Sequence, residues 1–206
     1  MAHVAHVDQS SEPLIDRDTW GSTIAGAASR MIFITWEPPP PTFLKVNFDG
    51  CVLDRGLRGD AGYVIRGPDS RVVAAGGSPI LDITVPGAEL RAAWAGLRHA
   101  RCLLGAVTVV LEGDSATVIG WIQGRPEATL CQHPLLRDIR LLSGRDVSFV
   151  ARHVYREGNR AADWVASFAA HHAGDFSWSG EGCLPRSLTA ILLSDSLGCI
   201  QSRVIN

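Results

Sequence analysis

Residues 43–75, which read FLKVNFDGCVLDRGLRGDAGYVIRGPDSRVVAA, decide the fold of this chain. Apolar and polar residues alternate from Leu44 to Asp49, which predicts a strand with two distinct faces. Two further strands are expected at 61–66 and 71–75, each after a turn rich in Gly or Pro. Short apolar runs with such punctuation are typical of hairpins, so the stretch predicts an antiparallel meander.

The residues after the meander supply helices and two more strands. The expected ranges are 86–104, 115–123, 134–143 and 159–171 for helices, and 107–111 and 147–155 for strands. The helices follow from apolar residues at three- and four-residue steps, and the strands from short apolar runs. A meander joined to strand–helix units predicts an α/β fold with a mixed sheet flanked by helices.

The two flanks carry weaker signals. Residues 31–36 form a short apolar run that predicts a strand, and the four prolines that start at Pro38 favour a stiff polyproline spacer. We expect an N-terminal extension with a Pro-rich linker at 1–42, the domain at 43–171 and a C-terminal tail at 172–206. The tail includes a helix-like stretch, and the sequence leaves open whether it packs on the domain.

Composition limits the class of protein. The 206 residues suffice for one core, and 46% apolar against 19% charged residues indicates a globular chain. The net charge of −2 gives no independent sign of nucleic-acid binding. The five cysteines form no CxxC pair, and the sequence shows neither a long apolar span nor a secretory signal. We expect an intracellular monomer, in the nucleus or the cytoplasm, without a membrane span.

Four acidic residues lie in four separate motifs, each at or near the edge of an expected strand or helix. They are Asp49 in KVNFDG, Glu89 in GAELRAAWAGL, Asp114 in VVLEGDSATVIGWI and Asp163 in REGNRAADWVASFA. Singly, each has a structural explanation as a turn residue, a helix cap or a partner of the helix dipole. Together they indicate a metal site, because carboxylates at the edge of a core repel one another unless a cation neutralises them.

The expected topology can bring these acids to one rim of the sheet. The strand that bears Asp49 and the strand that leads to Asp114 can lie side by side, and ligand sites gather at the carboxyl ends of strands in open sheets. The helices that begin near Glu89 and Asp163 can point their first turns to the same rim. Four oxygen donors in one place suit Mg²⁺ or Mn²⁺.

The same motifs, in this order, resemble a known family over about 43–171. They are similar to those of the type-1 ribonuclease H domain, in its reverse-transcriptase-like, retroelement-derived branch. The resemblance implies a ribonuclease H-like fold with a five-stranded mixed sheet, and hydrolysis of the RNA strand of RNA–DNA hybrids. By motif, the metal ligands would be Asp49, Glu89, Asp114 and Asp163, which would hold two Mg²⁺ ions for a two-metal mechanism, with Mn²⁺ as the other candidate metal.

Further candidates lie near these acids. Relatives use a residue before the last Asp for proton transfer or product release; here Arg156 fits the relatives with a short loop, and His153 is the alternative. Asn47 shares a strand face with Asp49, where its amide could orient a ligand or a 2′-hydroxyl, or be an ordinary strand residue. Asn159 is expected to cap a helix, and it could also contact substrate.

Two departures from the family pattern keep other functions open. Cys51 stands where many relatives have Ser or Ala, and the chain lacks the Lys- and Trp-rich insertion with which some relatives grip hybrids. Because phosphate neutralisation supplies most non-specific binding, we expect low intrinsic affinity for hybrids. The alternatives are a catalytically weak or inactive retroelement-derived nucleic-acid-binding domain, and an unrelated α/β domain whose acids are caps and turns.

Overall fold

The computed structural model of this protein describes residues 30–53, 58–80, 84–125, 133–144 and 149–205. Most of the expected N-terminal extension, part of the Gly-rich turn at 54–57, the start of the strand expected at 147–155, and Cys131 lie outside these ranges. The described cysteines, which are Cys51, Cys102, Cys183 and Cys199, are free thiols. Within the described part of the chain, no helix has the length and apolar character needed to cross a membrane.

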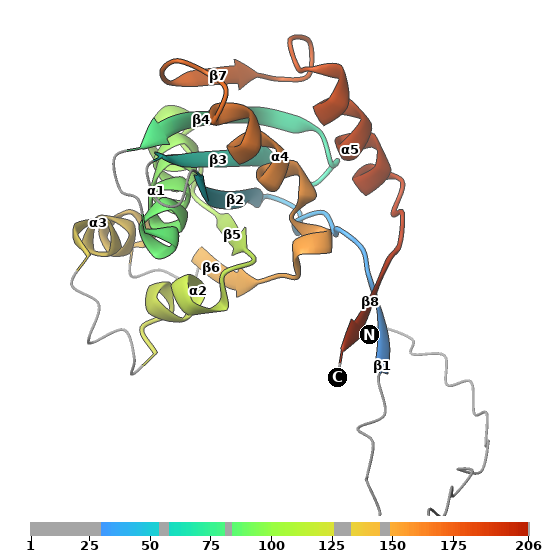
Figure 1. Cartoon of the computed structure of the whole chain (residues 1–206), viewed down its shortest axis with the longest axis horizontal. Coiled ribbons are helices and arrows are strands. Elements are labelled where there is room, and N and C mark those ends of the chain that lie inside the picture. Colours follow the sequence, from blue (N-terminus) through green and yellow to red (C-terminus); the bar gives the residue numbers. More distant parts are fainter. Residues whose placement is uncertain (1–29, 54–57, 81–83, 126–132, 145–148, 206) are drawn as a thin grey trace, which may run out of the picture.

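The centre of the molecule is a mixed sheet with the strand order β6-β5-β2-β3-β4-β7 (Figure 1). Its strands are β2 (Leu44–Leu53), β3 (Arg58–Arg66), β4 (Val72–Ile80), β5 (Val109–Gly113), β6 (Phe149–His153) and β7 (Phe176–Ser179). The first three form the expected antiparallel meander. β5 pairs in parallel with β2, and β6 pairs in parallel with β5. The α/β fold with a mixed sheet is therefore confirmed.

The five-stranded sheet that the resemblance implies is wrong by one strand. β7 pairs antiparallel with β4, so Phe176 lies opposite Gly77 and Trp178 opposite Ala75. This strand has only four residues, FSWS. Its alternation of aromatic residues with serines fits a pleated edge strand, but a run this short is weak as a sequence signal.

The described residues form five α-helices. They are α1 (Val85–Arg98), α2 (Ala116–Ile122), α3 (Pro134–Ser143), α4 (Arg160–Ala169) and α5 (Arg186–Ser196). The first three cover one face of the sheet, while α4 and α5 cover the other (Figure 1). The helix expected to run to residue 104 changes at Arg98 into a π-helical turn, η1 (His99–Leu103), before Gly105 reverses the chain at a φ of 66°.

Two glycines let helices approach the sheet closely. A Cβ atom on Gly50 of β2 would lie 2.3 Å from the backbone carbonyl carbon of Ala88, in the first turn of α1. A Cβ atom on Gly62 of β3 would lie 2.3 Å from the backbone nitrogen of Ala166 in α4. Only glycine fits where two backbones come this close. These two contacts fix where the helices cross the strands.

The polar side of β2 is buried as well as its apolar side. Val46 and Phe48 enter the core under α1, while Lys45, Asn47 and Asp49 point to the opposite face and are also buried. Asn47 is covered by Trp36, whose indole nitrogen donates to the Asn47 side-chain oxygen at 3.0 Å. The alternation of the sequence therefore marks two different interiors, one apolar and one polar.

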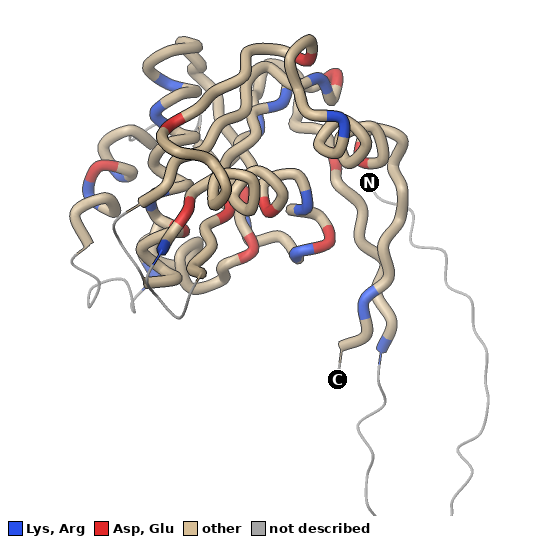
Figure 2. Tube along the Cα trace, turned by 45° about the horizontal axis from the view of Figure 1, so that its top comes forward, with Lys and Arg blue, Asp and Glu red and all other residues tan. Residues whose placement is uncertain are grey.

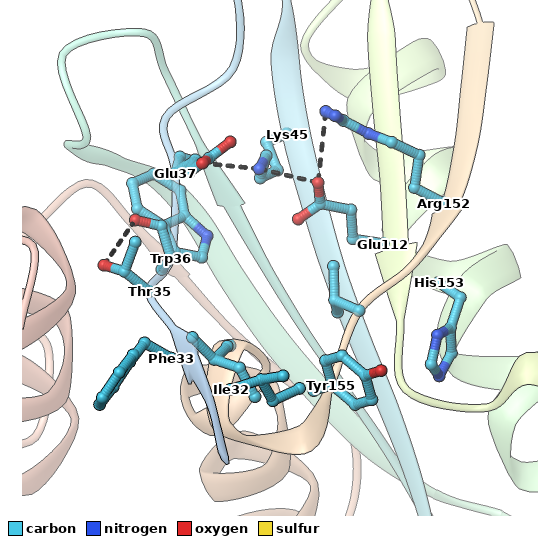
Figure 3. Close-up of a pocket in the computed structure, with 13 residues that line it drawn as sticks. Ile32, Phe33, Thr35, Trp36, Glu37, Lys45, Glu112, Arg152, His153 and Tyr155 are labelled. Atoms are coloured by element: carbon cyan, nitrogen blue, oxygen red, sulfur yellow. Dashed lines mark hydrogen bonds and ion pairs between the residues drawn. The ribbon is translucent and has the colours of Figure 1, made fainter. Parts of the chain in front are cut away.

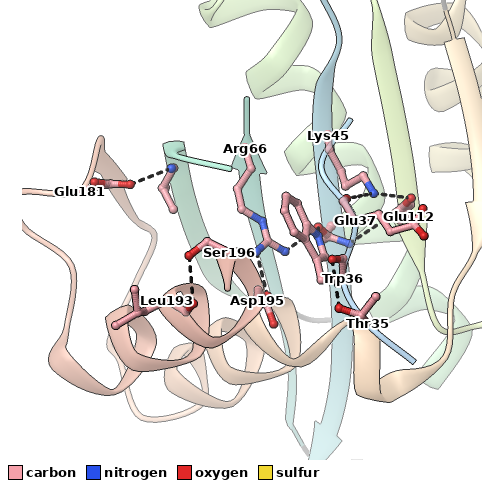
Figure 4. Close-up of polar contacts among 12 residues, drawn as sticks. Thr35, Trp36, Glu37, Lys45, Arg66, Glu112, Glu181, Leu193, Asp195 and Ser196 are labelled. Carbon is pink, nitrogen blue, oxygen red and sulfur yellow. Dashed lines mark hydrogen bonds and ion pairs between the residues drawn. The ribbon is translucent and has the colours of Figure 1, made fainter. Parts of the chain in front are cut away.

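The two flanks are joined to this polar interior. The Arg66 guanidinium from β3 lies 3.6 Å from the centre of the Trp36 ring and forms an ion pair with Asp195 of α5 at 2.8 Å (Figure 4). Beyond these contacts, β1 (Arg30–Ile34) and β8 (Gln201–Ile205) pair antiparallel as a separate two-stranded sheet. The helix expected in the tail is present as α5. The N-terminal segment from Arg30 and the C-terminal tail thus pack against the domain and against each other.

Candidate metal and active site

Three of the four candidate acids converge at one rim of the sheet. Asp49 comes from β2, Glu89 from the first helical turns of α1, and Asp114 directly follows β5. One carboxylate oxygen from each lies within 4.8 Å of the others. Acids that served only as separate caps and turns have no reason to meet, so this geometry argues against the unrelated α/β domain.

The convergence follows from the packing of the strands and helices. β2 and β5 are parallel neighbours with Asn47 opposite Glu112, so Asp49 and Asp114, each two residues further along its chain segment, lie side by side. The close approach at Gly50 places Glu89 next to Asp49, because α1 crosses β2 at that glycine. Thr84, and not an acid, caps this helix: its hydroxyl accepts the backbone N–H of Gly87 at 3.2 Å. Glu89 is therefore not needed for capping.

Asp163 faces the same pocket from the other side of the sheet. The pocket has a volume of about 400 Å³ and is lined by the four acids together with Gly50, Cys51, Leu53, Arg156, Ser167, Ala170 and His171. Asp163 is not among the three closest acids; its carboxylate pairs with the Arg156 guanidinium at 2.6 Å. Both partners of this pair are accessible, so the pair can open at little cost.

Burial and mutual repulsion change the protonation of two of the acids. The pKa of Asp49 is raised to about 8, mainly by burial and secondly by the nearby charges of Asp114 and Asp163. The pKa of Glu89 is raised to about 9, again mainly by burial and secondly by the charges of Asp49 and Asp114. Without a cation, the site therefore holds protons near neutral pH, because it cannot bear all of its negative charges.

The donor set fits a divalent cation. All of its ligand atoms are carboxylate oxygens, which hard cations such as Mg²⁺ prefer. Within the described residues, the Oε2 atom of Glu89 is buried without a hydrogen-bond partner. A buried oxygen of this kind costs free energy unless something satisfies it, and a cation between Asp49, Glu89 and Asp114 would do so.

Asn47 cannot contact substrate in this structure, so the interpretation of its amide as a ligand-orienting group is wrong. Its side chain is fully buried. The oxygen accepts from Trp36 and Arg66, both at 3.0 Å, and the nitrogen donates to Glu112 at 3.2 Å. Its role is to hold the polar interior together.

Asn159 and His153 lie outside the lining of the acidic pocket. Asn159 occupies the N-cap position of α4 without a side-chain capping bond; it is buried and its amide donates to the backbone oxygen of Phe48 at 2.8 Å. It therefore ties α4 to the residue before Asp49 and does not reach substrate. His153 is exposed at the end of β6, and its Nε2 lies 3.1 Å from the backbone oxygen of Asp114. Of the two candidates before Asp163, it is Arg156 that lines the acidic pocket.

Two residues of the pocket escaped the sequence reasoning, namely Ser167 and His171. Ser167 lies on α4 four residues after Asp163, and His171 follows the end of that helix after four more residues. That spacing was the available signal. Cys51 also lines the pocket, but burial and the neighbouring Asp60 and Asp49 raise the pKa of its thiol to about 11. It stays protonated and is no nucleophile.

Comparison with known proteins places this geometry among its relatives. Residues 47–169 match the family model described as "Reverse transcriptase-like". The Arabidopsis thaliana protein "Putative ribonuclease H protein At1g65750" is 28% identical over 188 residues, which cover 89% of this chain and 29% of that protein. The chain thus spans less than a third of the length of this curated relative.

Two solved structures of ribonuclease H proteins are also similar to this chain. The N-terminal ribonuclease H domain of Rv2228c from Mycobacterium tuberculosis, fused to maltose binding protein, has a TM-score of 0.56 and 27% identity over 63% of this chain and 94% of that one. Ribonuclease H1 of the halophilic archaeon Halobacterium salinarum NRC-1 has a TM-score of 0.55 and 30% identity over 64% of this chain and 99% of that one.

Proposed function

This chain belongs to the reverse transcriptase-like family and carries a type-1 ribonuclease H-like domain, and from that premise we propose that it is a metal-dependent endonuclease that hydrolyses the RNA strand of RNA–DNA hybrids. The observation that carries the proposal is the convergence of Asp49, Glu89 and Asp114, whose ligand atoms lie within 4.8 Å of one another. Asp163 completes the set at the rim of the same pocket.

The four acids have distinct places in this proposal. Asp49 is the central ligand, since the other three acids approach it from different elements. Glu89 and Asp114 hold the buried side of the site, and Asp163 holds the accessible side. Two bound Mg²⁺ ions, or Mn²⁺ ions, would activate the attacking water and stabilise the leaving 3′-oxygen.

Arg156 is the proposed partner of the substrate phosphate. Its side chain is 70% exposed and is held at the pocket by its ion pair with Asp163. Asp163 would be a ligand of a bound cation, and its ion pair with Arg156 would then compete with that cation. A guanidinium that is free of this pair can bind two phosphate oxygens with two parallel hydrogen bonds.

A second candidate function is a nucleic-acid-binding domain with little or no catalysis. The observation that favours weak catalysis is the ion pair of Asp163 with Arg156, which keeps the fourth carboxylate occupied. The scattered Lys and Arg positions in Figure 2 and the net charge of −2 indicate that such a domain would bind a hybrid weakly. Weak phosphate neutralisation limits how well the domain holds a hybrid by itself.

Cleavage of an end-labelled RNA–DNA hybrid in Mg²⁺ or Mn²⁺ tests the first function against the second. Wild type should cut the RNA strand, and both Asp49→Asn and Asp114→Asn should abolish cutting. Asp69→Asn removes an exposed acid far from the pocket and serves as the matched control. A wild type that binds the hybrid but leaves it uncut in both metals would establish the second function instead.

A further inference from the structure

A second cavity, of about 350 Å³, lies beside the acidic pocket and shares none of its described lining residues. It opens between the N-terminal segment that includes β1 and the edge strand β6 (Figure 3). Its lining includes Ile32, Trp36, Lys45, Glu112, Arg152 and Tyr155. The volume is in the range that holds small organic ligands in proteins.

The charged groups of the cavity neutralise one another. The Glu112 carboxylate lies 2.8 Å from the Lys45 ammonium and 3.4 Å from the Arg152 guanidinium. These groups lie at one end of the cavity in the view of Figure 3, and the only other described acid in the lining is Glu37. A phosphate needs cations that are not already paired, so this cavity is poorly suited to a phosphate.

The other end of the cavity is aromatic and apolar. The Tyr155 ring is 39% exposed and lies near Ile32 in the view of Figure 3, and the Arg203 guanidinium lies 5.0 Å from the centre of the ring. Trp36 lies at the charged end, where the Lys45 ammonium is 5.1 Å from the centre of its ring. The Tyr155 ring also packs edge-on against His153, with ring centres 5.8 Å apart. One end of the cavity has apolar walls, and at the other end the charged groups pair with one another. Such a cavity suits a flat, uncharged heterocycle whose edge forms hydrogen bonds. Among the components of a nucleic acid, that description fits a base.

His153 connects this cavity to the acidic site. It lines the cavity, and its Nε2 lies 3.1 Å from the backbone oxygen of Asp114. A strand whose phosphate is bound at the acids can therefore reach the cavity if it runs toward β6. Bases inside a duplex are stacked and paired, and they enter a protein pocket only when they are unpaired or extruded.

We propose that the cavity between β1 and β6 takes an unpaired nucleobase of the bound nucleic acid, so that the enzyme prefers hybrids that carry a single-stranded extension. The proposal rests on the proposed function, because it assumes that nucleic acid is the substrate of the neighbouring acids. It gives the N-terminal segment a part in substrate choice, since Ile32 and Trp36 supply one wall of the cavity.

Two measurements test the proposal. The first is the fluorescence anisotropy of a short labelled single-stranded oligonucleotide titrated with the protein in the absence of metal. Tyr155→Ala should weaken binding on the order of ten-fold, because stacking on an aromatic ring is lost. Tyr155→Phe keeps the ring and should bind as wild type does.

The second measurement is kcat/KM for cleavage of a blunt hybrid and of the same hybrid with an unpaired extension, placed at each strand end in turn. Wild type should favour one of the extended hybrids, and Tyr155→Ala should lose that preference while it still cuts the blunt hybrid.

Controls separate the cavity from general effects. Ile32→Trp fills the cavity without removing Tyr155 and should have the same effect as Tyr155→Ala. The test therefore still works if one of the two variants fails to fold. Leu141→Ser changes an exposed residue on α3 and should change neither measurement. If wild type cuts blunt and extended hybrids equally well, the cavity proposal fails and the proposed function stands. If no hybrid is cut but single strands bind through Tyr155, the proposed function and the preference in cleavage fail, and only the binding of a base in the cavity stands.

Discussion

Asp49 and Glu89 are the residues whose surroundings alter their chemistry most. In the metal-free protein their pKa values are raised from 3.8 to about 8 and from 4.5 to about 9, by burial first and by neighbouring carboxylates second. For a group whose pKa is higher in the folded than in the unfolded chain, the protonated form stabilises the fold. This stabilisation is complete below the unfolded pKa and is lost as the pH rises through the folded pKa. The acids that define the site therefore destabilise the metal-free fold in mild alkali.

This gives a prediction about pH. Without metal, Asp49→Asn should become more stable relative to wild type as the pH rises from about 5 to about 9, because the amide cannot ionise. Mg²⁺ should stabilise wild type more at the alkaline end, since its ligands must lose their protons. Urea unfolding at several pH values, with and without Mg²⁺, measures both effects. Asp69→Asn, at an exposed position, should show no such trend; a pH-independent difference for Asp49→Asn would contradict the account.

Arg156 leads to a second prediction at this scale. Its ion pair with Asp163 is largely exposed, so Arg156→Ala should change the free energy of unfolding by less than about 1 kcal/mol. If Arg156 binds the phosphate, activity should nevertheless fall on the order of 100-fold. Arg156→Lys should restore only part of it, because an ammonium cannot form the paired hydrogen bonds of a guanidinium. Equal rates for Arg156→Ala and wild type would remove Arg156 from the proposed mechanism.

The sequence predicted the acids better than it predicted their neighbours. Asp114 directly follows β5, as the local pattern indicates, while Asp49 lies inside β2, which continues to Leu53. Asn47 was misjudged because its environment is made by Trp36 and Arg66, which other segments of the chain contribute. The direction of an amide in a strand can be read from alternation, but what covers it depends on the tertiary fold.

At the scale of helices and strands, the site depends on how closely α1 and α4 approach the sheet. Both approaches occur at glycines, Gly50 and Gly62, where a Cβ atom would meet helix backbone at 2.3 Å. Gly62 lies opposite Asp49 across the β2–β3 pair. The helix that bears Asp163 is thus seated directly beside the central acid.

Gly62→Ala should therefore harm both stability and the site. The added methyl must push α4 away, and such overpacking costs about 1–3 kcal/mol. Because Asp163 moves with the helix, Mg²⁺ affinity should also fall. Gly182→Ala is the matched control, since a Cβ atom there meets no described heavy atom within 4 Å. Chemical unfolding and isothermal calorimetry with Mg²⁺ give the two readouts; a Gly62→Ala protein as stable as wild type would show that α4 does not rest on β3 as described.

The predictions for elements succeeded where periodicity extended over many residues. The helix expected at 134–143 is found as α3, and the meander strands pair as expected. β7 and β8 escaped prediction because they are four and five residues long and pair with strands far away in the chain. Short edge strands depend on their partners more than on their own sequence.

At the scale of the whole molecule, the buried ion pair of Arg66 and Asp195 joins the sheet to α5. Arg66 is only 1% exposed, and its charge is met by Asp195, by the oxygen of Asn47 and by the face of Trp36 (Figure 4). A buried pair of this kind adds little net stability compared with apolar residues, but removal of one partner is costly. Asp195 of α5 therefore neutralises a charge that the sheet buries.

Asp195→Ala should destabilise the protein by about 3–5 kcal/mol, because it leaves the Arg66 charge buried without its partner. The double variant Arg66→Met with Asp195→Leu should recover much of that loss, since no charge then remains to be buried. Asp138→Ala, at an exposed position on α3, is the control for loss of an acid from a helix. Urea unfolding measures all three; a double variant no better than Asp195→Ala would mean that the loss comes from packing of α5 and not from charge.

The Arg66–Asp195 contact spans 129 residues of sequence. During translation, Arg66 and Trp36 leave the ribosome long before Asp195 is made, since domains are synthesised from the N-terminal end. Until α5 emerges, the Arg66 guanidinium lacks the carboxylate with which it pairs in the folded protein. A chain that lacks α5 would therefore leave the Arg66 cation without its carboxylate partner, and we expect such a chain to be cut more readily by proteases than the one that includes α5.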